Sequence, residues 1–335
     1  MYRLWSQASL AKDKPKATFA PGLNLRDHVR ETRQNGERVY EFIGSTDFGA
    51  EWNTRRRFEV DAGRLQVPTL YEPIYSIIND ASLPKLIPIL RIGPGGAVLE
   101  EVYEGGEVKF MSVSSSTDSI AMHHYAVGLE YSKDLVVYNQ LWGVPIAERA
   151  VGAAYNALMN HLHFYPILNY SYQSGNDSGA VTSADTDEGD MIATLQAGVT
   201  EARTDQTNPR PGPYILLIGG ANQYKVERAL TRVPQFGVTK QSSVIDDISD
   251  VIVYDGWTGT RGRKTTTYSG VGSTYGYLIS TAQRDLDFQS YVKQGLEQAM
   301  GNPDVSRFIL DQIVWDCYQA VYANPLRSVQ RITLP

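Results

Sequence analysis

The second half of the chain carries the clearest grouping of apolar positions. The segment 214-YILLI-218 is a continuous apolar run, and Gly219-Gly220 separates it from 221-ANQYKVERAL-230. A short apolar run that ends in glycine predicts a buried strand, and the segment after it predicts an amphipathic helix. Similar apolar runs predict strands at 250–255, at 275–281 and at 326–335.

Three longer segments have the apolar spacing of helices. Residues 145–163 are rich in alanine, and Pro166 is expected to stop this helix. Residues 189–203 place Met191, Ile192, Leu195 and Val199 on one face. Residues 303–324 repeat their apolar positions with a period near 3.5, which predicts a last helix before the final strand.

The N-terminal part is more polar. Residues 1–60 look irregular, except for 24–39, a short polar helix candidate with Asn24 as N-cap. The segment 65–92 is interrupted by four prolines, which forbid a long helix. We therefore expect an extended arm there, with one short helix near Tyr75–Asn79.

A long hairpin is predicted next. Residues 97–113 form two β-like runs around Gly105-Gly106, and the second run continues through 119–132. Each run exceeds the usual strand length of about five to six residues. Because the hairpin is rich in Glu, Ser and Gly, we expect it to contact a neighbouring chain rather than its own domain.

Composition restricts the function classes. With 42% hydrophobic and 20% charged residues in 335, the chain is expected to fold into one large or two modest domains. The formal net charge of −6 argues against nucleic-acid affinity through overall charge, although it does not exclude local basic patches. The single cysteine, Cys317, excludes an internal disulfide framework and fits a reducing compartment. We see no signal peptide and no membrane-spanning run, and therefore expect a soluble protein folded in a cytoplasm.

The Gly219-Gly220 turn is the first candidate for chemistry. Its register matches neither G-x-G-x-x-G nor G-x-x-x-x-G-K-[ST]. We therefore prefer a structural turn to a phosphate site, with Asn222 as a helix N-cap. The glycine-rich run 270–276 precedes a strand and not a helix, so it is expected to be a loop.

The histidines show no metal-binding spacing. His123 and His124 would point to opposite faces of a strand, and His161 and His163 would be splayed on a helix. His28 stands alone. We expect all five to be surface or interface residues.

No other residue pattern predicts catalysis. Cys317 is expected to be a small buried apolar residue rather than a nucleophile. The carboxylate pairs Glu100-Glu101 and Asp246-Asp247 are typical of solvated faces, and no G-x-S-x-G motif is present. We therefore predict no catalytic residue, no cofactor and no metal.

One basic run stands out near the N-terminus, at Arg55, Arg56 and Arg57. It could contact nucleic-acid phosphates, or it could anchor an arm on an acidic neighbour. Given the overall negative charge, we prefer the second interpretation.

From about residue 89 onward, the order of elements resembles that of the major capsid proteins of tailed bacteriophages, which have the Hong Kong 97-type fold. Residues 97–137 look like the family's extended loop and its return, and 145–163 like its spine helix. Residues 189–203, 214–230 and 237–255 are similar to the helices and strands of its axial domain. Residues 317–334 resemble its closing helix, x-Pro and final peripheral strand.

The resemblance implies an α+β fold with an N-terminal arm, an extended β-hairpin loop (the E-loop), a peripheral domain with a long spine helix, and an axial domain. The implied segments are 1–88 for the arm and lead-in, 89–131 for the E-loop, 132–170 for the peripheral domain with the spine helix, 171–282 for the axial domain, and 283–335 for the C-terminal peripheral helix and strand.

The resemblance also implies a structural, non-catalytic role in the virion. The chain would assemble in the host cytoplasm into hexamers and pentamers of itself. Portal, a separate scaffolding protein, a decoration protein and non-specifically packaged double-stranded DNA would be its partners, with no membrane involved. The separate scaffold is expected because only a short arm follows Met1.

Inter-subunit contacts are expected from the E-loop and from the basic run of the arm. The E-loop residues are Glu100, Glu101, Tyr103, Glu104, Glu107 and Lys109. No acceptor amide matches Lys109, so no cross-link is predicted. The alternatives are an encapsulin-like shell protein and, in a different class, a nucleotide-binding α/β enzyme that uses the Gly219-Gly220 turn.

Overall fold

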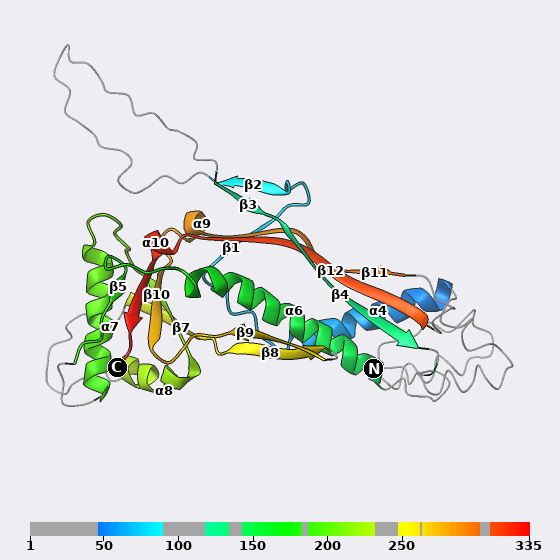
Figure 1. Ribbon diagram of the computed structural model, residues 1–335, viewed down its shortest axis with the longest axis horizontal. Helices are drawn as coiled ribbons and strands as arrows, with labels where there is room; N and C mark the ends of the chain where they lie inside the picture. The colour runs from blue at the N-terminus through cyan, green and yellow to red at the C-terminus, as the bar shows by residue number, and fades with distance from the viewer. Residues whose placement is uncertain are drawn as a thin grey trace, which may run out of the picture. The chain divides into compact units, whose positions relative to one another are not determined.

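The computed structural model describes residues 46–89, 118–132, 134, 143–182, 187–231, 247–261, 263–301 and 309–335. These residues fall into two compact units. The first unit takes its described residues from 1–68, 124–156 and 295–317, and the second takes them from 69–123, 157–294 and 318–335. Figure 1 labels the elements of both.

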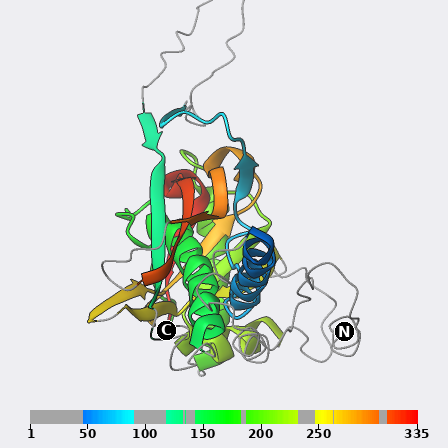
Figure 2. The same cartoon turned by 90° about the vertical axis from the view of Figure 1, so that its right-hand side faces the viewer.

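The second unit is built around a five-stranded sheet of order β5-β13-β10-β6-β7. Its strands are β5 (Asp177–Ser178), β6 (Tyr214–Ile218), β7 (Ile248–Val253), β10 (Tyr275–Ser280) and β13 (Val329–Thr333). Strand β10 runs antiparallel to both of its neighbours, while β6–β7 and β5–β13 are parallel pairs. Two helices, α7 (Asp187–Thr204) and α8 (Gly220–Thr231), pack on this sheet (Figures 1 and 2).

The core of this sheet has the composition that the apolar pattern predicted. All five residues of β6 are buried. Tyr214, Leu216 and Ile218 share a core cluster with Met191, Leu195 and Val199 of α7 and Val226 of α8. A strand flanked on both edges and covered on its faces must be apolar at every position, which explains its unbroken run. The predicted strands at 214–218, 250–255 and 275–281 and the helices at 189–203 and 221–230 are confirmed as β6, β7, β10, α7 and α8. The strand predicted at 326–335 is confirmed as β13 over Val329–Thr333, but its first residues lie in the short helix α10 (Pro325–Ser328).

The second unit also contains shorter pairings. Strand β1 (Ser76–Asn79) pairs in parallel with the start of β11 (Phe288–Met300). Strands β2 (Leu86–Ile89) and β3 (Asp118–Ala121) form one antiparallel pair, and β8 (Gly256–Arg261) and β9 (Lys264–Ser269) form another. Two short helices, α9 (Arg284–Asp287) and α10 (Pro325–Ser328), each precede a strand directly.

The first unit packs helix α4 (Thr46–Arg64) on the first half of α6 (Gly143–Leu168). A Cβ atom at Gly152 would overlap the carbonyl of Val60, and one at Gly63 would overlap the carbonyl of Arg149. Glycine at both crossing points therefore lets the helix backbones touch. The apolar core includes Val60, Val151 and residues of β4 (His123–Ser132) and β12 (Ile309–Ala323). These two strands are neighbours in a sheet of order β1-β11-β12-β4.

The predicted last helix at 303–324 is wrong where the structure describes it, because residues 309–323 form β12. Ile313, Trp315 and Cys317 are buried, whereas Val314 is exposed and Asp316 is half-buried. This alternation has the period of a strand. Isoleucine, valine and tryptophan favour strands, and pairing with β4 and β11 outweighs the approximate helical spacing.

Three further expectations need correction. The short helix near Tyr75–Asn79 is the strand β1, which backbone pairing with β11 holds extended. Residues 46–60, expected to be irregular, belong to α4, whose burial against α6 compensates for weak amphipathicity. Helix α6 continues past Pro166 to Leu168, because burial of Phe164 and Ile167 offsets the hydrogen bond that proline cannot make.

Some expectations fall outside the described residues, namely the polar helix at 24–39 and the hairpin at 97–113 around Gly105-Gly106. The continuation of that hairpin, 119–132, lies in β3 and β4 and is extended as predicted. Among the described residues, no helix combines the length and apolar character that a membrane crossing requires.

Candidate functional site

The strand-to-helix turn between β6 and α8 was the main candidate for ligand binding. Gly220 is the first residue of α8, and its backbone N–H donates to Asp255 Oδ1 over 2.5 Å. A Cβ atom on Gly220 would collide with the Asp255 carboxylate, and one on Gly219 would collide with the carbonyl of Val271. The two glycines are therefore required by close packing of the chain on itself.

The Asp255 carboxylate occupies the position that a phosphate would need. Helix N-termini bind anions because their N–H groups are unsatisfied and the helix dipole favours negative charge. Here a carboxylate of the same chain already accepts from the first N–H, so a second anion would meet like charge.

Asn222 completes this turn in a way that differs from the expected N-cap. It lies inside α8, it is buried, and its Nδ2 donates to the carbonyl of Ser273 over 2.6 Å. Asn222 thus ties the helix to the loop at 270–274, which is the loop predicted from its glycines. The arrangement stabilises the fold and leaves no open anion site at this turn.

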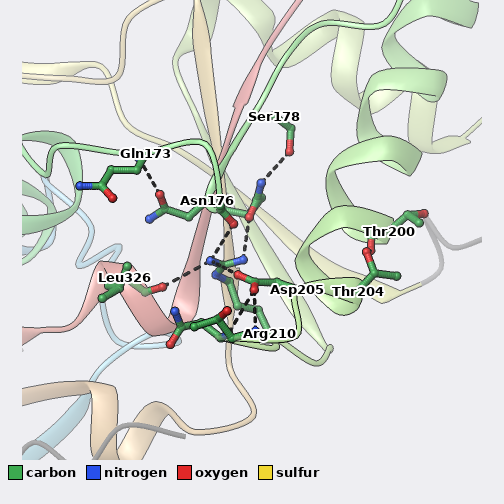
Figure 3. Close-up of polar contacts among 12 residues, drawn as sticks. Gln173, Asn176, Ser178, Thr200, Thr204, Asp205, Arg210 and Leu326 are labelled. Atoms are coloured by element: carbon green, nitrogen blue, oxygen red, sulfur yellow. Dashed lines mark hydrogen bonds and ion pairs between the residues drawn. The ribbon is translucent and has the colours of Figure 1, made fainter. Parts of the chain in front are cut away.

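A buried arginine organises the other end of the sheet (Figure 3). Arg210 is only 1% exposed, and its guanidinium donates to Gln330 Oε1 over 2.8 Å, to the Gly175 carbonyl over 3.0 Å and to Asp205 Oδ2 over 3.1 Å. Gln330 in turn donates to Ser178 Oγ over 2.6 Å. Burial lowers the pKa of Arg210, while Asp205 opposes the shift. The network fastens the segment before β6 to β5 and β13, which is a structural role.

The basic run Arg55–Arg57 lies on α4, and its three side chains differ in environment. Arg56 is buried and its Nε lies 3.1 Å from Glu148 Oε1 of α6. Arg57 is exposed and Arg55 is half-buried. The structure thus places Arg56 inside its own unit, facing a carboxylate, so it is not presented to a neighbouring subunit.

Glu148 is held in an unusual environment. Burial raises its pKa to about 7, although Arg56 and the Tyr131 hydroxyl, 3.3 Å away, act in the opposite direction. A second pair, Arg149 Nε to Glu59 Oε2 at 2.7 Å, joins the same two helices. Nothing in the local sequence around Glu148 indicates that it is buried against an arginine of α4.

The expectation that all histidines are surface or interface residues is wrong for His163. Its ring is fully buried, with Nδ1 2.6 Å from the Met159 carbonyl and Nε2 2.8 Å from Ser290 Oγ. It also stacks on Tyr71 with ring centroids 3.7 Å apart. Burial lowers the pKa of His163 to about 3. Tyr71 and Ser290, both far from His163 in sequence, supply the stacking and the hydroxyl partner, so helical spacing could not reveal them.

His124 and Cys317 have the environments that the sequence predicted. His124, on β4, lies 3.1 Å from Asp316 on β12. Cys317 is buried, and burial raises the pKa of its thiol to about 11, which makes it a poor nucleophile. Within the described ranges, no three His, Cys, Asp or Glu residues cluster closely enough to hold a metal ion.

The predicted E-loop contacts Glu100, Glu101, Tyr103, Glu104, Glu107 and Lys109 lie outside the described residues. Exposed apolar side chains are a feature that the sequence analysis did not identify. Phe58 is 58% exposed and Leu65 is 87% exposed, in and just after α4, and Ile146 at the start of α6 is 59% exposed. Single exposed apolar side chains are normal on folded proteins, and it is contiguous apolar patches that mark surfaces that contact other chains.

Comparison with solved structures identifies the fold. The capsid of cyanophage P-SCSP1u matches with a TM-score of 0.52 and 12% identity, covering 80% of this chain and 88% of that chain. The mature capsid of bacteriophage PhiM1 matches with a TM-score of 0.51 and 10% identity, covering 79% and 87%. A virus-like particle from Pyrococcus furiosus has a TM-score of 0.49 and 13% identity, covering 84% and 98%. The sequence matches no family model and no curated protein.

The two matches with TM-scores above 0.5 extend over most of each capsid chain. The fold is therefore that of phage capsid proteins, which confirms the Hong Kong 97-type fold expected from the sequence. At these identities the likeness concerns the fold.

Proposed function

We propose that this chain is the major capsid protein of a tailed phage, which self-assembles into the icosahedral head around double-stranded DNA. The observation that supports it most is the shared fold over 80% of this chain and 88% of a cyanophage capsid chain. A capsid subunit must bury part of its surface on neighbours, and we propose that the exposed Phe58, Leu65 and Ile146 are among the side chains that it buries there.

In this proposal the subunits form hexamers and pentamers. The E-loop residues Glu100, Glu101, Tyr103, Glu104, Glu107 and Lys109 contact a neighbouring subunit, as do the half-buried Arg55 and the exposed Arg57 of α4. Segment 1–88 is the arm and lead-in, 89–131 the E-loop, 132–170 the spine region, 171–282 the axial domain and 283–335 the returning peripheral part. The last segment contains the strands β11, β12 and β13, and its strand β13 joins β5, β6, β7 and β10 of the axial segment in one sheet.

The partners follow from this role. A separate scaffolding protein directs assembly in the host cytoplasm, and a portal occupies one vertex. Whether a decoration protein also binds the finished head is left open. The chain is then a component of the virion, and its only nucleic-acid partner is the packaged DNA. An encapsulin-like shell is the alternative within the same fold, and the content of purified particles, DNA or cargo protein, distinguishes the two.

The role requires no catalysis. The rival class, a nucleotide-binding enzyme, would need an anion site at Gly219-Gly220, where Asp255 already accepts the first N–H of α8. Isothermal titration of the purified protein with millimolar ATP or NAD should give no saturable heat. Saturable binding that Gly220→Val abolishes would support the rival instead.

Electron microscopy tests the proposed function directly. The chain is produced with its scaffold, purified and imaged in negative stain, and we expect closed shells or hexameric and pentameric rings. A protein that stays strictly monomeric under all conditions, with and without scaffold, would contradict the proposal.

A further inference from the structure

The β8–β9 hairpin, residues 256–269, has an unusual charge for this chain. Residues 256–284 contain Arg261, Arg263, Lys264 and Arg284 and no aspartate or glutamate, although the whole chain carries a net charge of −6. Three of these four cations lie at the tip, where Arg261 pairs with Lys264 and Arg263 lies in the turn. We call residues 256–269 the basic ribbon. In Figure 1 it is the yellow pair of strands.

The base of the basic ribbon is held by aromatic stacking. The Trp257 ring stacks on Tyr268 at 5.8 Å, and Tyr268 stacks on His161 of α6 at 4.5 Å. Trp257 also lies over Gly259, where any side chain would collide with its ring. The large apolar groups of the ribbon are therefore half-buried and engaged within the unit, whereas Arg263 and Lys264 at its tip are exposed.

Threonines line the rest of the basic ribbon. Thr258 and Thr260 lie opposite Thr267 and Thr265, and the hydroxyl oxygens of each pair are 3.3 Å apart. All four residues and their neighbour Thr266 are exposed. A hydroxyl has one proton and two lone pairs, so each internal bond uses one of two protons and leaves the other for an outside acceptor. The ribbon thus combines cations with a row of hydroxyl donors.

This combination fits phosphate better than a protein surface. Protein–protein interfaces have cores rich in aromatic and methionine side chains, and the exposed part of the basic ribbon presents threonine and cations instead. Contacts to nucleic-acid phosphates are made by arginine, lysine and threonine side chains. A two-stranded β-ribbon also fits the major groove of B-form DNA.

We propose that the basic ribbon is a contact site for the phosphate backbone of duplex DNA, independent of base sequence. The proposal rests on the function proposed above, in which the shell encloses double-stranded DNA. It locates nucleic-acid affinity in one ribbon, while the negative charge of the remaining chain disfavours contact elsewhere. The packaged duplex is then held weakly and reversibly at many identical points.

The number of phosphates contacted determines how strongly DNA binding depends on salt concentration. Each neutralised phosphate contributes about 0.9 to the slope of log Kobs against log salt, so three cations predict a slope of about −2.7. Raising the salt from about 50 to about 200 mM should therefore weaken binding about 40-fold. The double variant Arg263→Ala/Lys264→Ala retains one of the three tip cations and should lose only about 3- to 4-fold over the same range.

Fluorescence anisotropy with a labelled 30-base-pair duplex and the full-length unassembled chain measures the binding affinity and its dependence on salt. The charge-matched control is Lys85→Ala/Lys225→Ala, which removes two cations outside the basic ribbon and should keep the wild-type slope. A second variant, Thr265→Val/Thr267→Val, removes two hydroxyls with little change in shape or strand propensity. It should weaken binding at every salt concentration without changing the slope, because hydroxyls carry no charge.

The proposal is overturned if wild-type protein shows no saturable binding at about 50 mM salt, or if Arg263→Ala/Lys264→Ala retains the wild-type slope. It is also overturned if that variant changes only the sedimentation of assembled particles, since the ribbon would then contact a second copy of the chain. Negative-stain micrographs of wild-type shells report on the proposed function separately, because the binding assay uses unassembled protein and does not depend on shell formation.

Discussion

Histidine 163 should make the protein sensitive to mild acid. Its ring nitrogens lie 2.6 Å from the Met159 carbonyl and 2.8 Å from Ser290 Oγ, and the ring stacks on Tyr71. A charged imidazole in this buried position would be poorly solvated, so burial lowers the pKa to about 3 from an ordinary value of 6.5. The folded state therefore holds the neutral ring far below the pH at which the unfolded chain takes up a proton.

The direction and size of the pH effect on stability follow from the difference between the folded and unfolded pKa values of His163. Below pH 6.5 the unfolded state binds one more proton than the folded state, so stability falls as the pH falls from 6.5 toward 3. Each unit of difference in pKa corresponds to about 1.4 kcal/mol. pH 5 lies about 1.5 pH units below the pKa of histidine in the unfolded chain. Protonation of the unfolded state therefore lowers the free energy of unfolding by about 2 kcal/mol at pH 5 relative to pH 7.5.

Urea unfolding of the unassembled chain at pH 7.5 and pH 5.0 measures the effect. His163→Gln loses the stacking and should be destabilised at pH 7.5, but the penalty should be about 2 kcal/mol smaller at pH 5.0. Phe164→Leu is the matched control, because Phe164 is equally buried on α6 and does not titrate. Its penalty should be the same at both values. An equal penalty for His163→Gln at both pH values would refute the assignment of a neutral buried ring.

Three further outcomes test the fold and the assembly. Gly152→Ala should lower the melting temperature by several degrees, corresponding to about 1–3 kcal/mol, because its Cβ would overlap an α4 carbonyl. The control Gly143→Ala lies in the same helix with free space around its Cβ and should not destabilise the protein. Arg56→Ala should lower the free energy of unfolding by about 3–5 kcal/mol at pH 8, because it leaves the buried Glu148 carboxylate without its counter-ion. The loss should be smaller at pH 5, below the folded pKa of about 7, where the carboxyl is protonated. Chemical denaturation at both pH values measures the difference. Deletion of residues 100–112 should leave circular dichroism and monomer stability intact but weaken lateral assembly in micrographs, and unfolding of the isolated subunit would contradict the E-loop assignment.

Local pattern predicted the elements whose burial is uniform or simple. The run at 214–218 is apolar at all five positions because β6 is flanked on both edges and covered on its faces, and the glycines after it mark the start of α8. The alanine-rich segment 145–163 predicts α6 through its high helix propensity. In these segments the residue pattern and the tertiary environment agree, so propensity and period suffice.

The C-terminal strand shows where such reasoning fails. Residues 309–323 contain apolar positions that satisfy a helical period approximately, and the burial of Ile313, Trp315 and Cys317 shows that the period is two. The choice between them depends on pairing with the preceding strand β11 and with β4, which is distant in sequence. A short pattern cannot include that non-local pairing energy.

By itself, the sequence determined that the chain has a mixed α and β fold, that no known nucleotide or metal motif is present, and that its order of elements resembles that of capsid proteins. Only the tertiary structure decided that Arg56 faces Glu148, that His163 is buried and neutral, and that Asp255 occupies the N-terminus of α8. The physical reason is the same in each case. The pKa and accessibility of a polar side chain depend on charges and surfaces supplied by residues far along the chain, and only folding brings these together.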